Sequence, residues 1–559
     1  MTELAQTSGT ATIGSSQPDF VEIDGFTLTI EDIALVARGL SDGTFPEVVL
    51  SDEARRVTNE ARAYVDEHFL APDAPAIYGI NTGLGRLMDV RVPAEDQARF
   101  QRLVINSHSA GVGEPLPLDE TRALLLLRTN AIAKGMSGVR IECIDRLIAM
   151  LNADVLPVIP GQGSVGASGD LAPLAHMVSV MVGHEKAEAY HRGVRMPAVE
   201  ALTAAGLATE FELKPKDVLA LINGSTISLA TACLALHDAW SLTRQADVAL
   251  SLSLEAIRGE LDAFDERIHL ARNAPGQVDV AANVRALTAG SERTVEEARR
   301  LRLPDEQRVG GVYKPRVQDA YSLRCAPQVH GTTRESLLFA QTLLVREANA
   351  ATDNPLVLPD GEGGYDVLSG GNFHGEPIGV AADLIAIAVA EIGAISERRS
   401  FRLTDPNLSY GLPLNLVGGQ LGLNTGFSIV HCAAAAIASE NKVLCFPSVV
   451  DSIPTKANQE DHVSMCTFSS RKARSIIHNT QVILGVEFIL ATQGIDLASP
   501  HLEDRALGEG STAAYEAVRS IVPMTREDIY QSEQMINAQA MVVLGTVLTA
   551  VEARIGAVR

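Results

Sequence analysis

A long helical pattern near residues 216–260 sets the strongest limit on the fold of this chain. Apolar residues recur along it at helical spacing, and it is longer than a usual globular helix. Hydrophobic residues make up 46% of the chain but aromatic residues only 4%, so the core must be aliphatic and rich in alanine. We therefore expect a mainly α protein built around a long helical bundle. Further periodic segments, separated by Gly, Pro and Asn, lie near 119–153, 329–350, 376–402, 425–442, 469–496 and 512–555.

The chain has 559 residues, which is enough for two or more compact domains. Residues 1–19 are polar and rich in Ser, Thr and Gly, and we expect them to be a disordered tail. Residues 20–30 alternate well enough to predict a short hairpin. We place a boundary near residue 210, between a smaller mixed N-terminal domain at 20–210 and a helical-bundle domain at 211–559.

The net charge and the cysteines indicate which partners and which cellular compartment to expect. A net charge of −23 argues against binding to nucleic acid or to an anionic membrane, and a solvated acidic surface explains it. Apolar stretches such as 379–395 carry acidic residues, which favours buried helices over membrane spans. The six cysteines are scattered, which indicates a reducing compartment. No signal peptide is apparent at the start of the chain, so we expect a soluble cytoplasmic protein.

Three motifs of other protein classes are considered and rejected. Residues 161–166 fit the dinucleotide pattern G-x-G-x-x-G, but no regular alternation of strands and helices surrounds them, and Pro160 comes directly before. Residues 439–442 fit S-x-x-K without its companion motifs, so a helix face is the better interpretation. There is no H-E-x-x-H and no clustered set of His and Cys, so we expect no metal site.

The tripeptide Ala167-Ser168-Gly169 can supply an electrophile from the chain itself. Small residues surround it in the segment 163–174, and glycine tolerates positive φ and close backbone approach. In a strained turn, the Gly169 nitrogen can attack the Ala167 carbonyl. Loss of water then closes a five-membered ring, and loss of the serine hydroxyl as a second water leaves an exocyclic methylene. The alternative is an ordinary helix start, since Ser-Gly-Asp often begins a helix.

Two further segments carry groups suited to an amino-acid substrate. Tyr78 leads the glycine-rich loop 78–85, which is either a mobile lid or an ordinary surface loop with a packing tyrosine. Arg324, in the segment 318–325, offers a planar fork that suits a carboxylate, although an arginine among apolar residues is usually part of a structural ion pair.

These motifs, in the same order over about residues 25–500, resemble the methylidene-imidazolone (MIO) family: the histidine, phenylalanine and tyrosine ammonia-lyases and the related 2,3-aminomutases. The resemblance implies that Ala167, Ser168 and Gly169 form the MIO group autocatalytically within the N-terminal domain, with no external cofactor. It implies loss of ammonia from a small aromatic amino acid. It also implies a homotetramer whose active sites combine residues from several subunits.

The resemblance further implies roles for residues around the reacting atoms. Tyr78 would remove the β-proton of the substrate. Arg324 and Asn223 would anchor its carboxylate, and Tyr321 and Gln318 would orient the amine and the electrophile. Helix N-termini aimed at the electrophile would stabilise the negative charge that develops there. Asn223 on its own would be interpreted as a turn residue.

Three other positions concern the ring of the substrate and its surroundings. Phe373 matches a residue packed beside the electrophile, a role compatible with simple core packing. His108 matches a histidine kept by histidine and tyrosine ammonia-lyases. Glu460, in the segment 458–465, matches the histidine ammonia-lyase pattern, where it could accept a hydrogen bond from an imidazole; an isolated run of this kind would be a solvated turn. L-Histidine, giving urocanate, is the preferred substrate.

Some positions depart from the histidine pattern. Leu84 stands where a phenylalanine is common, and residues 225–226 are Ser-Thr where Thr-Gln is expected. The segments 409–413 and 513–523 are more similar to tyrosine aminomutases and aryl lyases. A tyrosine or phenylalanine ammonia-lyase, or an aromatic 2,3-aminomutase, therefore stays open as the alternative.

Overall fold

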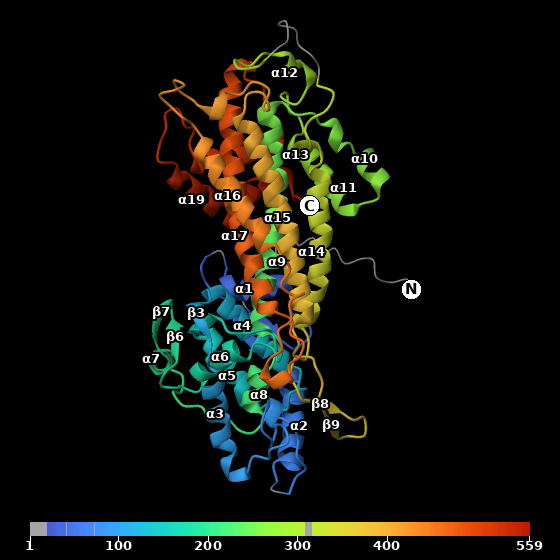
Figure 1. The fold of residues 1–559 in the computed structure, drawn as a ribbon, viewed down its shortest axis with the longest axis vertical. Coiled ribbons are helices and arrows are strands. Elements are labelled where there is room, and N and C mark those ends of the chain that lie inside the picture. The colour runs from blue at the N-terminus through green and yellow to red at the C-terminus, as the bar shows by residue number, and fades with distance from the viewer. Residues whose placement is uncertain (1–19, 41, 72, 308–315) are drawn as a thin grey trace. The chain divides into compact units, whose positions relative to one another are not determined.

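The computed structural model describes residues 20–40, 42–71, 73–307 and 316–559, so the predicted disordered tail at 1–19 lies outside the described residues. The chain divides into two compact units (Figure 1). The first contains Met1–Gln162, Ala172–Ile222 and Asn349–Gly370, and the second contains Gly163–Leu171, Asn223–Ala348 and Gly371–Arg559. The units are interleaved along the chain, which differs from a single boundary near residue 210. The tripeptide groups with the helical unit and not with the mixed one.

The first unit mixes helices with small sheets. In the described residues, β1 (Phe20–Ile23) pairs in parallel with β2 (Glu47–Leu50), and the other pairings are antiparallel: β3 (Val112–Pro115) with β5 (Pro160–Gln162), β6 (Glu188–His191) with β4 (Val155–Pro157) and β7 (Val194–Pro197), and β8 (Leu356–Pro359) with β9 (Tyr365–Leu368). Its helices are α1 (Ile30–Arg38), α2 (Asp52–Phe69), α3 (Gln97–His108), α4 (Leu118–Ala133), α5 (Ile141–Asn152), α7 (Ala198–Ala204) and α8 (Asp217–Ile222). α6 (Leu171–Met181) begins at the last residue of the loop assigned to the second unit.

The hairpin predicted for residues 20–30 is wrong. After β1, the Asp24 carboxylate accepts a hydrogen bond from the Phe26 amide at 2.6 Å and closes a tight turn. Thr29 then caps α1, because its hydroxyl accepts from the Asp32 amide at 3.1 Å while the Asp32 carboxylate accepts from the Thr29 amide at 3.0 Å. This capping box commits the following residues to a helix. β1 finds its partner further along the chain, in β2.

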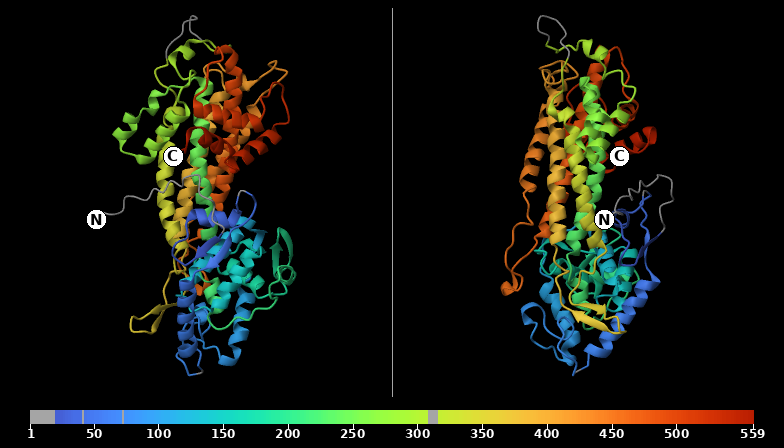
Figure 2. Two further views of the ribbon diagram at one scale, coloured as in Figure 1. Left: turned by 180° about the vertical axis from the view of Figure 1, so that it is seen from behind. Right: turned by 90° about the vertical axis from the view of Figure 1, so that its right-hand side faces the viewer.

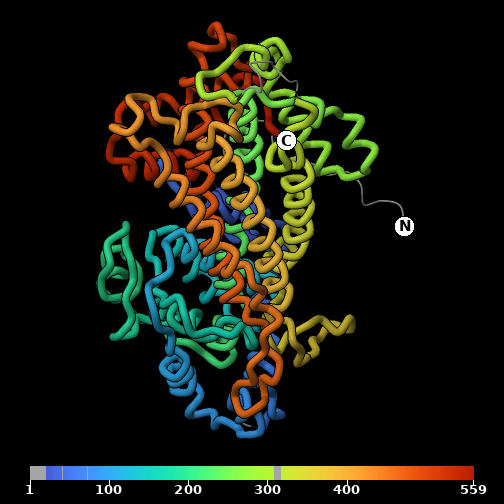
Figure 3. The backbone as a smooth tube through the Cα atoms, turned by 45° about the horizontal axis from the view of Figure 1, so that its top comes forward, coloured from blue at the N-terminus to red at the C-terminus, as the bar shows by residue number. Residues whose placement is uncertain are grey.

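The second unit is a helical bundle, as the sequence predicted. The long helices α9 (Thr226–Ile257), α14 (Ala326–Ala348), α15 (Glu376–Thr404), α16 (Ser428–Leu444) and α17 (Cys466–Ala498) lie side by side (Figure 1, Figure 2 and Figure 3). Shorter helices accompany them: α10 (Glu266–Arg272), α11 (Pro275–Leu287), α12 (Glu296–Arg300), α13 (Tyr321–Arg324), α18 (Glu509–Ile521), α19 (Gln531–Val543) and α20 (Thr546–Ile555).

Three of the periodic segments are broken where the sequence predicted continuity. The segment 216–260 is interrupted between α8 and α9, at Asn223 to Ser225. The segment 119–153 becomes α4 and α5, and Gly135, in the turn after α4, has a φ of 71°. The segment 512–555 becomes three helices, and Gly545 has a φ of 65° between the last two. Glycine adopts such left-handed conformations without the steric cost that a side chain imposes.

The helices at the centre of the second unit are buried by protein. α9 is almost wholly buried along its length. Two stretches, Glu376–Thr404 and Cys466–His501, are long and apolar enough to cross a membrane by length and composition, but 72% and 78% of their most apolar windows are buried inside the protein. The sequence predicted buried helices in the first of these stretches.

One buried carboxylate ties the three central helices together. Glu487 of α17 accepts hydrogen bonds from Ser253 of α9 at 2.7 Å and from Ser396 of α15 at 2.6 Å. It also receives both arms of Arg399 of α15, at 2.5 and 2.8 Å, and neither charged side chain is exposed. Four hydrogen bonds from fixed protein groups therefore compensate the charge of the Glu487 carboxylate in place of water.

We expect Glu487→Ala to destabilise the second unit by about 3–5 kcal/mol, because Arg399 would be left as a buried, uncompensated cation. The measurement is the midpoint of urea unfolding. Glu516→Ala is the matched control, since Glu516 pairs with Arg554 at 3.5 Å on the exposed side of the bundle and its loss should cost less than about 1 kcal/mol. Equal midpoints for the two variants would show that the buried pair does not hold the helices together.

Candidate active site

The loop that contains the tripeptide has a left-handed backbone at two glycines. Gly166 and Gly169 have φ values of 68° and 71°. Gly169 forms a parallel bridge with Gly224, and the Asp170 amide donates to the Gly224 carbonyl at 2.8 Å. A Cβ on Gly169 would overlap the main chain of Gly224, so a side chain cannot be accommodated there. This contact is the reason that the tripeptide groups with the helical unit.

Three helix N-termini of the second unit converge on this loop. The amide of Gly375, which precedes α15, donates to the Gly166 carbonyl at 3.1 Å, and the amide of Met465, which precedes α17, donates to the Val165 carbonyl at 2.9 Å. Ser225 precedes α9 and follows the glycine that bridges to Gly169. Helix N-termini carry partial positive charge, so the loop lies in a region that favours developing negative charge.

Asp170 fastens the same loop from inside. Its carboxylate is fully buried and accepts hydrogen bonds from the Ser164 hydroxyl at 2.7 Å, the Thr467 hydroxyl at 2.8 Å and both the amide and the hydroxyl of Ser228, at 2.9 and 3.0 Å. Burial raises the pKa of Asp170, and the hydrogen bonds offset only part of that effect. The sequence analysis did not single out this residue. Its place directly after the tripeptide was the only local signal.

Glu460 lies against the central residue of the tripeptide. The Ser168 hydroxyl donates to one of its carboxylate oxygens, and Lys456 lies 2.6 Å from that same oxygen. The Thr455 hydroxyl donates to the other oxygen at 2.7 Å. Burial by itself would raise the pKa of Glu460, but the hydrogen bonds from Lys456, Ser168 and Thr455 outweigh it and lower the pKa. The carboxylate is therefore ionised at neutral pH, and its side chain is largely shielded from solvent although residues 456–459 of the same turn are exposed.

Two more of the predicted residues reach this cluster through the main chain. Asn223 is buried and directly precedes Gly224. The carbonyl of Phe373 accepts a hydrogen bond from the Ser225 hydroxyl at 3.0 Å. The structure thus gathers Ser168, Asn223, Phe373 and Glu460, from four separate segments of the second unit, around one loop.

Gln318, Tyr321 and Arg324 lie elsewhere in the second unit. The segment that carries them is attached to the C-terminal end of α9: the Arg316 guanidinium donates to the Ile257 carbonyl at 3.0 Å, and the Glu260 amide donates to the Asp319 carboxylate at 2.6 Å. The tripeptide loop is attached to the N-terminal end of the same helix. At 1.5 Å per residue, α9 separates its two ends by about 46 Å.

A second helix gives the same result. Gly375, at the start of α15, donates to Gly166, whereas Arg399, near the end of α15, donates to the Ser322 carbonyl at 3.3 Å. The rise along α15 between these two residues is about 36 Å. Tyr321 is 70% exposed, and Arg324 lies over its ring and donates to the Asp319 carbonyl at 2.8 Å. Within one chain, these residues and the tripeptide do not share a site.

Tyr78 and His108 belong to the first unit. Tyr78 is half-buried, and its phenolic oxygen accepts a hydrogen bond from the Gly85 amide at 3.2 Å, across its own glycine-rich loop. Asn81 anchors that loop, since its side chain accepts from the Ile77 amide at 2.8 Å and donates to the Pro75 carbonyl at 2.9 Å. His108 ends α3, with Nδ1 2.9 Å from the Val104 carbonyl oxygen.

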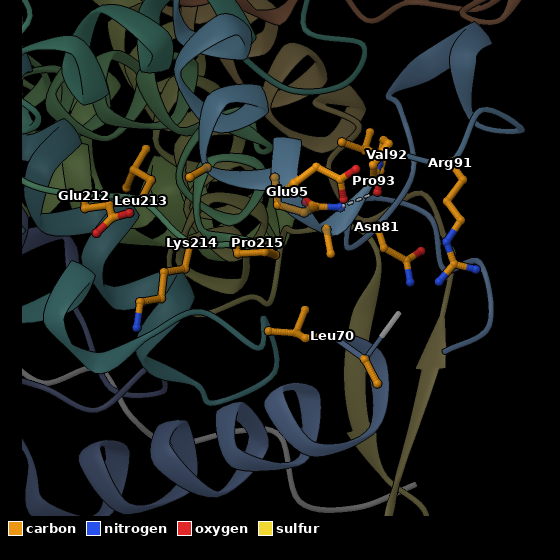
Figure 4. A pocket seen from close by; sticks show the side chains of 14 residues that line it. Leu70, Asn81, Arg91, Val92, Pro93, Glu95, Glu212, Leu213, Lys214 and Pro215 are labelled. Carbon is orange, nitrogen blue, oxygen red and sulfur yellow. Dashed lines mark hydrogen bonds between the residues drawn. The ribbon is translucent and has the colours of Figure 1, made fainter. Parts of the chain in front are cut away.

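A cavity of about 470 Å³ also lies in the first unit (Figure 4). Asn81 forms part of its wall, and Gln97 is fixed beside it by a hydrogen bond to the Val92 carbonyl at 3.0 Å. Two cationic and two acidic side chains line it, Arg91, Lys214, Glu95 and Glu212, so their formal charges cancel. None of the predicted site residues lines this cavity, so its size alone does not mark the active site.

Comparisons with known proteins give independent information on the family of this chain. Residues 28–520 match the aromatic amino acid lyase family. The histidine ammonia-lyase of Caldanaerobacter subterraneus subsp. tengcongensis is 45% identical over 508 residues, which cover 91% of this chain and 93% of that protein. The crystal structure of histidine ammonia-lyase from Trypanosoma cruzi superposes with a TM-score of 0.83 at 39% identity, covering 96% of this chain and 95% of that one.

The tyrosine aminomutase of Streptomyces globisporus superposes with a TM-score of 0.86 at 34% identity, covering 96% of this chain and 99% of that one. Substrate type therefore varies among proteins that share this fold over almost their whole length. Because the match to the family spans most of the sequence, and relatives well above 30% identity cover nearly all of it, this chain belongs to the aromatic amino acid lyase family.

Proposed function

We propose that this carbon–nitrogen lyase removes ammonia from L-histidine, without oxidation or hydrolysis, to give urocanate. The observation that carries the proposal is the ionised Glu460 carboxylate held against Ser168 by Lys456 and Thr455. A carboxylate in this position can accept a hydrogen bond from an imidazole N–H of a substrate bound at the tripeptide. The similarity to histidine ammonia-lyases at 45% and 39% identity supports the same substrate.

The residues around the tripeptide fit an MIO group made from Ala167, Ser168 and Gly169. Ring closure needs the Gly169 nitrogen near the Ala167 carbonyl, and a backbone with positive φ on both sides of Ala167-Ser168 supports such a turn. The absence of room for a Cβ at Gly169 supports a loop that is compressed against Gly224. When formed, the group supplies an electrophile that no ordinary side chain provides.

In this proposal, the other residues bind the substrate and move its proton. Tyr78 takes the β-proton, and Asn223 and Arg324 hold the carboxylate. Tyr321 and Gln318 orient the amine. The three helix N-termini at the loop favour the negative charge that develops during elimination, because their partial positive charge is already in place.

The contacts with the substrate ring form the last part of the proposal. His108 and Glu460 recognise the substrate ring by forming hydrogen bonds with it. Phe373 packs beside the electrophile, where its main chain is fixed by Ser225. A site that hydrogen-bonds a polar ring discriminates strongly against a ring that cannot return the bonds, because its buried groups are then left unpaired.

We further propose that each active site is shared between copies of the chain in a homotetramer. The separation of about 36–46 Å between the tripeptide and the Arg324 segment supports this sharing, because helices of fixed rise cannot bring the two together within one chain. A second copy packed alongside in the opposite direction would bring its Arg324 segment to the tripeptide of the first. We propose a cytoplasmic location, with no nucleic acid or membrane partner.

An aromatic lyase or 2,3-aminomutase acting on tyrosine or phenylalanine is the second candidate. The specific observation in its favour is the likeness to the tyrosine aminomutase of Streptomyces globisporus over nearly the whole chain. Tyr410 belongs to the segment 409–413, which is more similar to tyrosine aminomutases and aryl lyases. It has a φ of 61°, and the Arg316 guanidinium lies 3.8 Å from the centre of its ring. A mutase would return the ammonia to the β-carbon and release a β-amino acid.

Product analysis tests the proposal. Purified protein given L-histidine, L-tyrosine and L-phenylalanine separately should form urocanate and no β-amino acid, as read by chiral chromatography with mass detection. Ser168→Ala should stay folded and lose turnover, and its mass should lack the loss of about 36 Da that two waters give in the parent chain. Coumarate, cinnamate or a β-amino acid as the main product would move the protein to the second candidate.

We expect Glu460→Gln to lower kcat/KM for histidine about ten- to a hundredfold, the value of a hydrogen bond to a charged group, and to affect any activity on tyrosine much less. The intact mass of the variant is measured first, so that a failure of ring formation is not mistaken for a change of specificity. Asp461→Asn is the matched control, because Asp461 is the exposed neighbour. An equal loss on both substrates would remove Glu460 from the recognition of the ring.

Two inactive variants test the shared site. Ser168→Ala and Arg324→Ala should each be inactive, but their co-expressed mixture should regain turnover, since a hybrid site can join an intact tripeptide to an intact Arg324. A mixture of Ser168→Ala with Asn223→Ala is the control. Both of these residues belong to one cluster of one chain, so no hybrid site would be complete. Recovery in the control, or none in the first mixture, would contradict the sharing.

A further inference from the structure

Two imidazoles and a carboxylate meet beside the tripeptide cluster, although the sequence analysis predicted no metal site. His374 and Glu376 lie at the start of α15, and His462 belongs to the loop before α17. One possible ligand atom from each of the three side chains lies within 4.8 Å of the other two. The third residue is 86 positions away from Glu376 in the sequence, so no spacing motif signals the cluster.

The carboxylate lacks a partner that its burial calls for. The Oε2 atom of Glu376 is buried, and it has no hydrogen-bond partner among the residues that the structure describes. A buried carboxylate oxygen without a donor or a cation is unfavourable. The carboxylate that carries this atom is one of the three groups of the cluster.

His374 has a hydrogen-bond partner of the kind that commonly orients a metal-binding histidine. The Nε2 atom of His374 lies 3.2 Å from the carbonyl oxygen of His462, so this main chain can orient the ring. A neutral imidazole that donates from one nitrogen keeps a lone pair on the other, which is the usual state of a metal-binding histidine. The two rings have centroids 5.7 Å apart and planes 33° apart, so they lie next to each other without stacking tightly.

We propose that His374, Glu376 and His462 bind one divalent first-row transition metal ion, with Zn²⁺ as the best match to the donors. Nitrogen and carboxylate ligands at about 2.0–2.2 Å from a tetrahedral ion lie about 3.3–3.5 Å apart. The possible ligand atoms of the cluster lie within 4.8 Å of one another, and closing around an ion would need rotation of the exposed His462 side chain. Three protein ligands leave the fourth position to water.

A bound ion would fasten two segments that carry proposed site residues. Phe373 directly precedes His374, and Glu460 lies two residues before His462. The ion would therefore link the loop at 455–465 to the N-terminus of α15. The proposal rests on these three ligands and not on the proposed reaction, so its test needs no substrate.

Binding is measured with Co²⁺ as the spectroscopic probe, on full-length protein without a polyhistidine tag. The parent chain should bind one Co²⁺ with a visible d–d absorption band, and Zn²⁺ should displace it. His462→Ala should lose the band, and Glu376→Gln, which keeps the shape of the side chain, should weaken binding by at least about tenfold. His501→Ala, at an exposed histidine outside the cluster, should bind as the parent does.

The same titrations can overturn the proposal. A Co²⁺ band of equal strength in the parent and in His462→Ala would place the metal elsewhere on the protein. Unchanged affinity in Glu376→Gln would remove the carboxylate from the site. Absence of a band in the parent, with circular dichroism showing a folded protein, would reject the site altogether.

Discussion

The convergence of three helix N-termini on one compressed loop is the interaction on which the rest of the second unit depends. Amides that precede α15 and α17 donate to carbonyls of the tripeptide loop, and the residue before α9 follows the glycine that bridges to Gly169. The buried Asp170 carboxylate then fastens the loop to the first turns of α9 and α17. These groups are strongly polar and are all satisfied by one another, so the loop cannot relax without leaving several of them unpaired. The same arrangement that holds the loop also directs three helix N-termini, which carry partial positive charge, toward it, and this links the stability of the fold to the proposed chemistry.

The long helices position residues as well as build a core. Glu487, Arg399 and the serines that contact Glu487 hold α9, α15 and α17 together near the C-terminal ends of α9 and α15. Because α-helices have a fixed rise, residues attached to opposite ends of these helices are kept about 36–46 Å apart. The helices hold the Arg324 segment and the tripeptide in fixed positions, and for the same reason they keep the two apart within one chain. In the proposed site shared between copies, the same rigidity would hold each segment at a fixed position for its partner from the other copy.

The surroundings of some charged and polar residues in the structure differ from those that their local sequence predicts. The run around Glu460 is typical of a solvated turn, but in the structure its carboxylate receives a lysine and two hydroxyls and lies against Ser168. His374 stands close to Glu376 in the sequence, but His462 joins them only because the loop before α17 meets the start of α15. Ser168 is distant in the sequence from Glu460, and His462 from Glu376, whereas Lys456 and Thr455 are close to Glu460. Tertiary contacts therefore add to local ones in deciding what these charges do.

The mainly α bundle can be predicted from the amino-acid sequence, because helical periodicity and an aliphatic composition are properties of local stretches. The family and the tripeptide can be predicted in the same way, since the small residues that allow a compressed turn are contiguous. The tertiary structure was needed to establish where the helices break, that residues 20–30 do not form a hairpin, and that the tripeptide loop joins the helical unit. It alone also revealed Asp170 as the fastening group and the separation of Arg324 from Ser168 within one chain. These outcomes depend on hydrogen bonds and close contacts between residues far apart in the chain, and no local propensity encodes such contacts.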